Sequence, residues 1–183
     1  MKMLKIFFLG IAFALGSAAT ADNPVRLKNF REIYASLVTV TGVDGRDAEL
    51  TELFRVNVDR LPKVGEAGEL SSNVVLAATE LSGAFCKKAL DREKALPRGE
   101  RNLFGQVDLN RGPRQFTNYL KGRITEQYAQ AFWLRAPSAT EKEVLSQLID
   151  RLRTNVTDSA DETEKLLQVF CVSFGSSLAF LTK

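Results

Sequence analysis

The sequence predicts an all-α protein, an antiparallel bundle of five to six helices. Apolar residues recur at spacings of three and four through each long segment after Pro24, and this is the period of an α-helix. The chain has five prolines, and each lies at a boundary that the apolar pattern marks independently. The helices are joined by short connections, which favour antiparallel neighbours.

The first two helices are predicted over residues 25–40 and 47–61. Gly42 provides a stop for the first helix, and Pro62 ends the second because proline cannot continue a helix. Residues 63–68 form a glycine-containing loop. The inward faces are formed by Leu27, Phe30, Ile33, Tyr34, Leu37 and Val38 in the first helix and by Leu50, Leu53, Phe54 and Leu61 in the second.

The third helix is predicted from residue 71 or 72 to residue 90 or one turn beyond. Ser71 and Ser72 can each cap its free amide groups. Residues 97–112 follow and are the least periodic stretch of the chain, which indicates a loop. The apolar face of the third helix carries Val74, Val75, Ala78, Leu81, Phe85 and Cys86.

The C-terminal half contains three further predicted helices. The fourth covers residues 113–134 and has apolar side chains four residues apart. Ser138 and Glu141 form a capping-box pattern that opens the fifth. The last begins near Thr157 and runs to about Leu181. The buried faces are expected to contain Phe116, Leu120, Ile124, Tyr128 and Phe132, then Val144, Leu145, Leu148, Ile149 and Leu152, and finally Leu166, Leu167, Phe170, Cys171 and Phe174.

Residues 1–21 have the composition of a cleavable secretory signal. Lys2 and Lys5 precede an apolar run, and residues 19–21 (Ala-Thr-Ala) form a small-residue cleavage site. The run is shorter than the roughly 20 consecutive apolar residues of a membrane span. We therefore expect residues 22–183 to form a single helical domain with no transmembrane anchor, located in the periplasm, at the cell surface or outside the cell. An uncleaved N-terminal anchor is the alternative.

The composition limits the chemistry of the protein. The chain contains no histidine, which excludes Ser-His-Asp and Cys-His nucleophile systems and histidine-ligated zinc. It also has no glycine-rich phosphate loop of standard spacing. Loss of the signal removes two lysines and leaves 23 basic against 22 acidic residues, a net charge of +1. We expect no catalytic residues, no cofactor, no metal site and no nucleic-acid partner.

Cys86 and Cys171 are the two cysteines of the chain. An even number in an exported protein favours a disulfide, and one intramolecular pairing is possible. Free thiols in a cytoplasmic protein and a bridge between two chains are the alternatives. A bridge between Cys86 and Cys171 would close a long loop. In the chain-entropy model, closing a loop of this length stabilises a fold by at most roughly 4–5 kcal/mol.

Three short patterns occur in a familiar order. They extend from Phe30 through Leu37 to Thr41-Gly42-Val43, from Leu61-Pro62 through Leu70-Ser71-Ser72 to Phe85-Cys86, and from Phe170-Cys171-Val172 to Ser176-Ser177. This order resembles a poorly characterised, cysteine-paired helical region of bacterial envelope and surface proteins, some of which also carry laminin-G-like domains. The resemblance implies export, a helical fold and a Cys86–Cys171 bridge. It implies no reaction.

Basic residues are concentrated between residues 87 and 123. This stretch has ten basic and four acidic residues, a local charge of +6. We predict that Arg98, Arg101, Arg111 and Arg114 bind an anionic partner, either an envelope protein or an anionic envelope polymer. The alternative is a solvated face balanced by acidic residues of neighbouring helices.

Two further features of the sequence have both a functional and a structural interpretation. Phe104 and Val107 lie within the polar loop and are either an exposed anchor for a partner or a contact that fixes the loop to the bundle. Residues 155–157 (Asn-Val-Thr) match the glycosylation acceptor pattern, although chance explains such a short match in a chain with a bacterial type of signal.

We expect an exported, non-catalytic envelope or secreted protein that acts as a binding or assembly component. The alternative is a carboxylate-dependent envelope hydrolase of the glycosidase type, since two carboxylates can hydrolyse a glycosidic bond without histidine. Glu49 with Glu52, and Asp161 with Glu164, are acid pairs at three-residue spacing. Such pairs are common on solvated helices.

Overall fold

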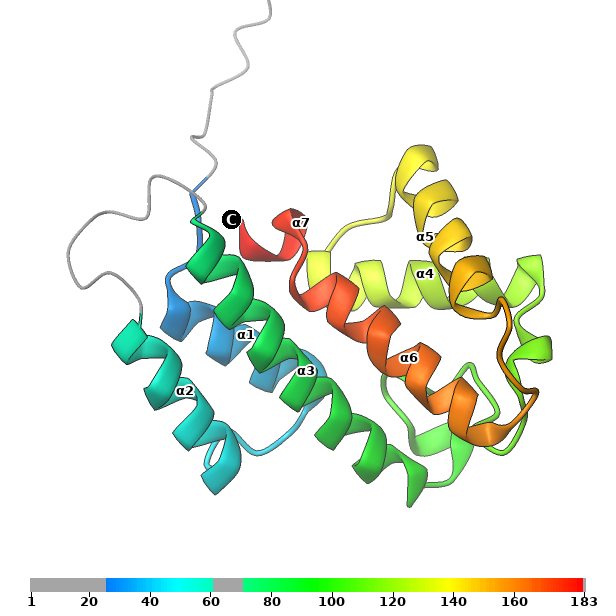
Figure 1. Cartoon of the computed structure of the whole chain (residues 1–183), viewed down its shortest axis with the longest axis horizontal. Helices are drawn as coiled ribbons and strands as arrows, with labels where there is room; N and C mark the ends of the chain where they lie inside the picture. Colours follow the sequence, from blue (N-terminus) through cyan, green and yellow to red (C-terminus); the bar gives the residue numbers. More distant parts are fainter. Residues whose placement is uncertain (1–25, 61–70, 183) are drawn as a thin grey trace, which may run out of the picture.

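The computed structural model describes residues 26–60 and 71–182, which form a helical bundle (Figure 1). Within these residues there is no strand, and a single isolated bridge joins Leu27 to Thr182. The all-α prediction is confirmed. The elements are α1 (Phe30–Thr41), α2 (Ala48–Arg60), α3 (Ser72–Lys94), the 3-10 turns η1 (Arg98–Glu100) and η2 (Pro113–Gln115), α4 (Asn118–Trp133), α5 (Ala139–Leu152), α6 (Ala160–Gly175) and α7 (Leu178–Leu181).

Helices α3 and α6 lie side by side at the centre of the bundle and run in opposite directions (Figure 1). A disulfide joins Cys86 of α3 to Cys171 of α6, with the two Cα atoms 6.0 Å apart. Both cysteines are fully buried, and the predicted bridge is confirmed. Helices α1 and α2 pack against α3, whereas α4 and α5 pack against α6.

An aromatic cluster fills the space between α4 and α6. The Tyr128 ring lies 5.3 Å from the Phe170 ring and 5.4 Å from the Phe174 ring, and Phe132 stacks beside it at 6.0 Å. Tilted ring pairs at these separations stabilise a core beyond the area that they bury. Tyr128 and Phe132, two members of the apolar stripe predicted for the fourth helix, therefore contribute to the contact between α4 and α6.

Several predicted helix ends are confirmed by side-chain caps. The Ser71 hydroxyl accepts the N–H of Val74 at the start of α3. Ser138 and Glu141 form the expected capping box at the start of α5. Gly42 closes α1 in the left-handed conformation, with φ of 62°, which glycine adopts without steric cost.

Three predicted boundaries are wrong. The first helix begins at Phe30, because Asn29 and Glu32 form a capping box there. The fourth begins at Asn118, because residues 113–115 form a 3-10 turn and Thr117 caps the helix that follows. The last helix is interrupted after residue 175, since the Ser177 hydroxyl accepts the N–H of Phe180 and starts α7.

Pro62, the loop at residues 63–68 and the signal at residues 1–21 lie outside the described residues. Between residues 26 and 60 and between 71 and 182, no helix is both long and apolar enough to cross a lipid bilayer.

Candidate functional site

The four arginines of the predicted binding patch fall into two pairs, and the first pair holds a loop together. Arg98 donates from Nε to the carbonyl of Gly105 at 2.9 Å and from Nη2 to that of Gln106 at 2.6 Å. Arg101 donates from Nε to the carbonyl of Leu96 at 3.0 Å. These guanidinium groups therefore satisfy carbonyls of the loop between α3 and η2, and they stabilise its fold.

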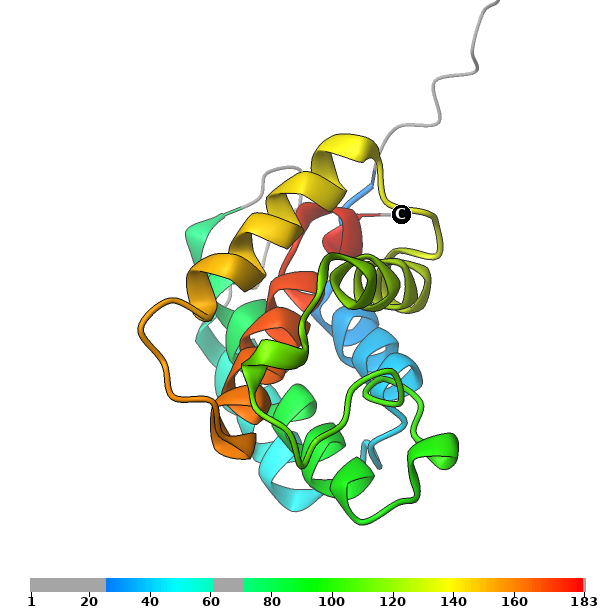
Figure 2. The same cartoon turned by 90° about the vertical axis from the view of Figure 1, so that its right-hand side faces the viewer.

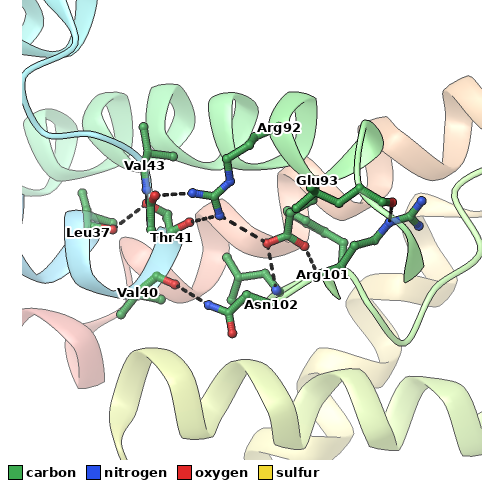
Figure 3. Close-up of polar contacts among 12 residues, drawn as sticks. Leu37, Val40, Thr41, Val43, Arg92, Glu93, Arg101 and Asn102 are labelled. Atoms are coloured by element: carbon green, nitrogen blue, oxygen red, sulfur yellow. Dashed lines mark hydrogen bonds and ion pairs between the residues drawn. The ribbon is translucent and has the colours of Figure 1, made fainter. Parts of the chain in front are cut away.

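Glu93 fixes the same loop from the interior. Its side chain is fully buried, and its two carboxylate oxygens accept the backbone N–H groups of Leu103 at 3.1 Å and Phe104 at 2.9 Å (Figure 3). The Arg92 guanidinium lies 3.7 Å away and supplies the opposite charge. Phe104 and Val107 are consequently buried, which confirms that they attach the loop to the bundle and excludes an exposed anchor.

Arg92 also connects α3 to the end of α1. Its guanidinium donates to the carbonyl of Thr41 at 2.9 Å and to that of Gly42 (Figure 3). Asn102 of the loop donates to the carbonyl of Val40 at 3.3 Å. The final carbonyls of a helix have no partner within the helix itself, so these side chains cap α1 from outside.

Tyr128 lies beside this network but has no acid–base role near neutral pH. It is fully buried, and within the described residues its hydroxyl has no hydrogen-bond partner. Burial and the negative charge of Glu93 hold the pKa of Tyr128 well above its usual value. The hydroxyl therefore stays protonated.

The second pair of arginines, Arg111 and Arg114, is exposed to solvent. The green segment between α3 and α4, which carries both residues, lies at the front of the molecule in Figure 2. The Arg114 side chain is 87% exposed, and its Nε lies 3.6 Å from Asp158 Oδ2. The backbone beneath it is fixed, since the Arg114 N–H donates to Asp158 Oδ1 at 2.9 Å and the Thr163 hydroxyl donates to the Arg111 carbonyl at 2.7 Å. An exposed guanidinium on a fixed backbone is available for a ligand.

A groove of about 370 Å³ opens beside Arg114, between η2 and the connection from α5 to α6. We call it the polar groove. Gly112 allows the backbone before η2 to approach Asp158 closely, because a Cβ atom at position 112 would collide with Asp158. Charged and hydroxyl-bearing side chains dominate the lining, which consists of Pro113, Arg114, Asp150, Arg153, Thr154, Val156, Thr157 and Asp158.

The floor of the polar groove is an ion-pair network. Arg153 Nη1 donates to the carbonyl of Phe116 at 2.7 Å and lies 3.4 Å from Asp150 Oδ1. The other oxygen of Asp150 accepts from Lys121 Nζ at 2.7 Å, and the Lys121 side chain is only 6% exposed. Asp150 is thus bound by two cations, and Arg153 is anchored to the backbone of the neighbouring element.

The comparisons with protein-family models, curated proteins and solved structures find no match to this chain. The suggested similarity to a cysteine-paired envelope region therefore stays a prediction. The function has to be inferred from the geometry of the chain itself.

Sequence reasoning found Arg114 but missed the other charged residues of the polar groove. Asp150 lies in the last turn of α5 and Arg153 directly follows this helix, and in the sequence both have the appearance of ordinary surface residues. Glu93 did carry a signal, because it follows Cys86 by seven residues and Ala89 by four and so lies on the apolar face of its helix. Lys121 similarly lies three and seven residues before Ile124 and Tyr128.

The acid pairs noted in the sequence lie on the surface, and three of the four side chains are engaged by cations. In the parts of the chain that the structure describes, no group of three or more acidic or cysteine side chains could hold a metal ion. The ion pairs are Glu49 with Lys88 at 2.9 Å, Glu52 with Arg55 at 2.6 Å and Glu164 with Lys94 at 2.7 Å.

Two other grooves are less polar. One of about 470 Å³ lies between α1 and α4, and Lys28 is the single charged residue in its lining. Another of about 570 Å³ lies along α6 beside Thr79 of α3, and its single charged lining residue is Lys165. Among these three grooves, the polar groove alone combines several charges with an arginine that the sequence predicted.

Proposed function

We propose that this protein is an exported, non-catalytic component of the cell envelope or of the secreted fraction, and that it binds an anionic envelope polymer. The observation that carries the proposal is Arg114, an exposed guanidinium on a rigid backbone at the edge of the polar groove. The buried Cys86–Cys171 disulfide supports export, because disulfides persist in oxidising compartments.

The four arginines differ in whether their side chains are available to contact an anionic polymer. Arg111 and Arg114 face solvent, whereas Arg98 and Arg101 donate to carbonyls of their own loop. Replacing Arg98 and Arg101 would disturb the loop as well as the charge. The binding function is therefore best tested at Arg111 and Arg114.

The experiment is sedimentation of the purified exported protein with an envelope fraction, with and without Arg111→Gln and Arg114→Gln. Arg31→Gln with Arg151→Gln is the matched control, because both side chains are exposed and the charge change is equal. We expect the Arg111→Gln and Arg114→Gln double variant to be released from the envelope fraction. Added salt should release the unchanged protein as well, since exposed charges are screened beyond about 8 Å at physiological ionic strength. Equal retention of both double variants at low salt would contradict the proposal, and retention that survives removal of the polymer would assign a partner protein.

The alternative of a glycosidase-like hydrolase requires two carboxylates about 5–10 Å apart across a cleft, free to act on a substrate. Asp150 and Asp158 do line one groove. Asp150 is bound by Lys121 and Arg153, and Asp158 accepts the Arg114 N–H. These engagements support a binding role over a catalytic one.

A further inference from the structure

We infer that the polar groove binds a phosphate ester, held between the guanidinium groups of Arg114 and Arg153. This inference rests on the proposed function, since it names the chemical group that the protein would recognise on an anionic polymer. Four features of the polar groove carry it: unused guanidinium donors, unused backbone donors, their placement on two walls, and the local charge.

Both arginines have donors to spare. The Arg114 guanidinium donates no hydrogen bond to a described residue, and its Nε lies 3.6 Å from Asp158 Oδ2 in an ion pair. The protein contacts of Arg153 use Nη1, which binds the Phe116 carbonyl and lies near Asp150. The remaining N–H groups of both side chains have no acceptor in the described part of the chain. Hydrogen bonds from such charged donors are about twice as strong as those between neutral groups.

The connection from α5 to α6 adds backbone donors. Asn155 has a left-handed conformation, with φ of 64°, which turns the chain sharply after α5. The N–H groups of Val156 and Thr157, both in the lining, donate to no acceptor among the described residues. Successive N–H groups next to a left-handed residue form a concave surface that favours anions.

The donors reach the polar groove from two walls. Arg114 lies on the wall formed by η2, whereas Arg153 and Thr157 lie on the wall formed by α5 and the connection to α6. A tetrahedral phosphate has oxygens that point in several directions and can accept from both walls, whereas a planar carboxylate has two oxygens on one side. Guanidinium groups also match phosphate geometry through paired donors.

The local charge favours an anion in spite of the two carboxylates. Asp150 is bound by Lys121 and Arg153, and Asp158 accepts from the Arg114 backbone. Three cationic side chains thus stand against two carboxylates in and beneath the polar groove, an excess of one positive charge. A phosphate ester, which carries at least one negative charge at neutral pH, would offset this excess.

The test is an NMR titration of the exported protein with sn-glycerol 3-phosphate at low salt. We expect shifts at the N–H groups of Val156 and Thr157. Arg114→Gln should weaken the affinity by about tenfold, the loss of one charge-assisted hydrogen bond. Arg151→Gln is the matched control, because this exposed arginine lies two residues from Arg153 but outside the lining of the polar groove. The affinity of this variant for sn-glycerol 3-phosphate should change by less than about twofold. Arg153→Gln is less informative, because it also removes the bond to Phe116.

Equal weakening by Arg114→Gln and Arg151→Gln, or an absence of shifts at the polar groove, would overturn the inference. Vesicles of phosphatidylcholine with phosphatidylglycerol distinguish the source of the phosphate. If the protein binds the vesicles and Arg114→Gln abolishes this binding, the phosphate belongs to a lipid headgroup. If the protein binds glycerol phosphate but not the vesicles, the phosphate belongs to a soluble or polymeric ester.

The two proposals fail in different ways. If attachment to envelope material depends on Arg111 and Arg114 but the polar groove binds no phosphate, the proposed function stands and this inference is wrong. If the polar groove binds phosphate but the protein does not attach to envelope material, this inference stands and the proposed function is wrong.

Discussion

Gly175 of α6 lies directly against Ser82 of α3, so that a Cβ atom at position 175 would be 2.6 Å from the Ser82 hydroxyl oxygen. Ser82 is fully buried, and no described residue hydrogen-bonds to its hydroxyl. The absence of a side chain at position 175 thus allows the two central helices to approach closely near the end of α6.

Gly175→Ala should therefore destabilise the protein by about 1–3 kcal/mol, the usual cost of overpacking a core. Gly83→Ala is the control, since a Cβ atom there meets nothing within 4 Å. It should stabilise α3 by about 0.5–1 kcal/mol because alanine favours a helix interior. Urea unfolding of both variants measures the difference, and adding Ser82→Ala to Gly175→Ala should restore part of the loss. A neutral Gly175→Ala would show that the helices do not approach so closely.

Replacing Cys86 or Cys171 with alanine should lower the free energy of unfolding by up to about 4–5 kcal/mol, because the bridge closes a loop of 85 residues. The double replacement should cost little more than either single one, since each removes the same bond. Chemical unfolding monitored by circular dichroism checks this. Thiol titration of the unfolded, unreduced protein should find no free thiol, and two per chain would refute the bridge.

Glu93→Gln should release the loop after α3. A glutamine amide presents one acceptor and a donor where the carboxylate now accepts from both Leu103 and Phe104, so a buried N–H loses its partner. We expect a loss of about 1–3 kcal/mol. Hydrogen exchange should show faster exchange at these two amides, whereas Glu100→Gln on the exposed turn η1 should change neither. Unchanged protection in Glu93→Gln would contradict the assigned role.

Acid should weaken the start of α5. The Arg135 guanidinium and the backbone of Ser138 lower the pKa of Glu141 from 4.5 to about 2. A carboxyl whose pKa is lower in the folded state stabilises the fold above its unfolded pKa, and this contribution disappears as the pH falls from about 4.5 to about 2. Glu141→Gln should remove it at neutral pH and flatten the pH dependence. Glu143→Gln, which replaces a carboxylate that accepts from the neutral Gln147 amide, is the control for urea unfolding at a series of pH values.

Export should yield a mature chain that begins at Asp22. This expectation comes from the small residues at positions 19–21, which lie outside the described part of the structure. The intact mass of the exported protein decides it, and a mass that includes residues 1–21 would rule out the cleaved signal in favour of the anchor.

The helices themselves could be predicted because each buries one apolar stripe, and a stripe is a local property of sequence. Their ends were less predictable. The start at Phe30 depends on a reciprocal contact between Asn29 and Glu32, and the break before α7 depends on the Ser177 hydroxyl. Such side-chain contacts with the backbone change a boundary by several residues without altering the apolar pattern.

The candidate site was only partly predictable, because charge in a sequence does not show where a guanidinium points. Arg98 and Arg114 look equivalent along the chain, yet one donates to carbonyls of its own loop and the other faces solvent. The polar groove also needs residues from η2 and α5, which come together only when the chain has folded. Compositional reasoning can locate a basic stretch, but not its partners from other helices.

The position of the disulfide determines how the protein would bear mechanical load. A pull on the two ends of the chain passes from Cys86 to Cys171 through the sulfur atoms, so the 85-residue segment that they close carries no tension. At roughly 3.5 Å per extended residue, about 300 Å of chain is withheld from stretching. Arg111, Arg114 and Arg153 all lie within this shielded segment. If the exported protein were stretched between two attachment points, α1 and α2 would unfold while the polar groove stayed free of tension.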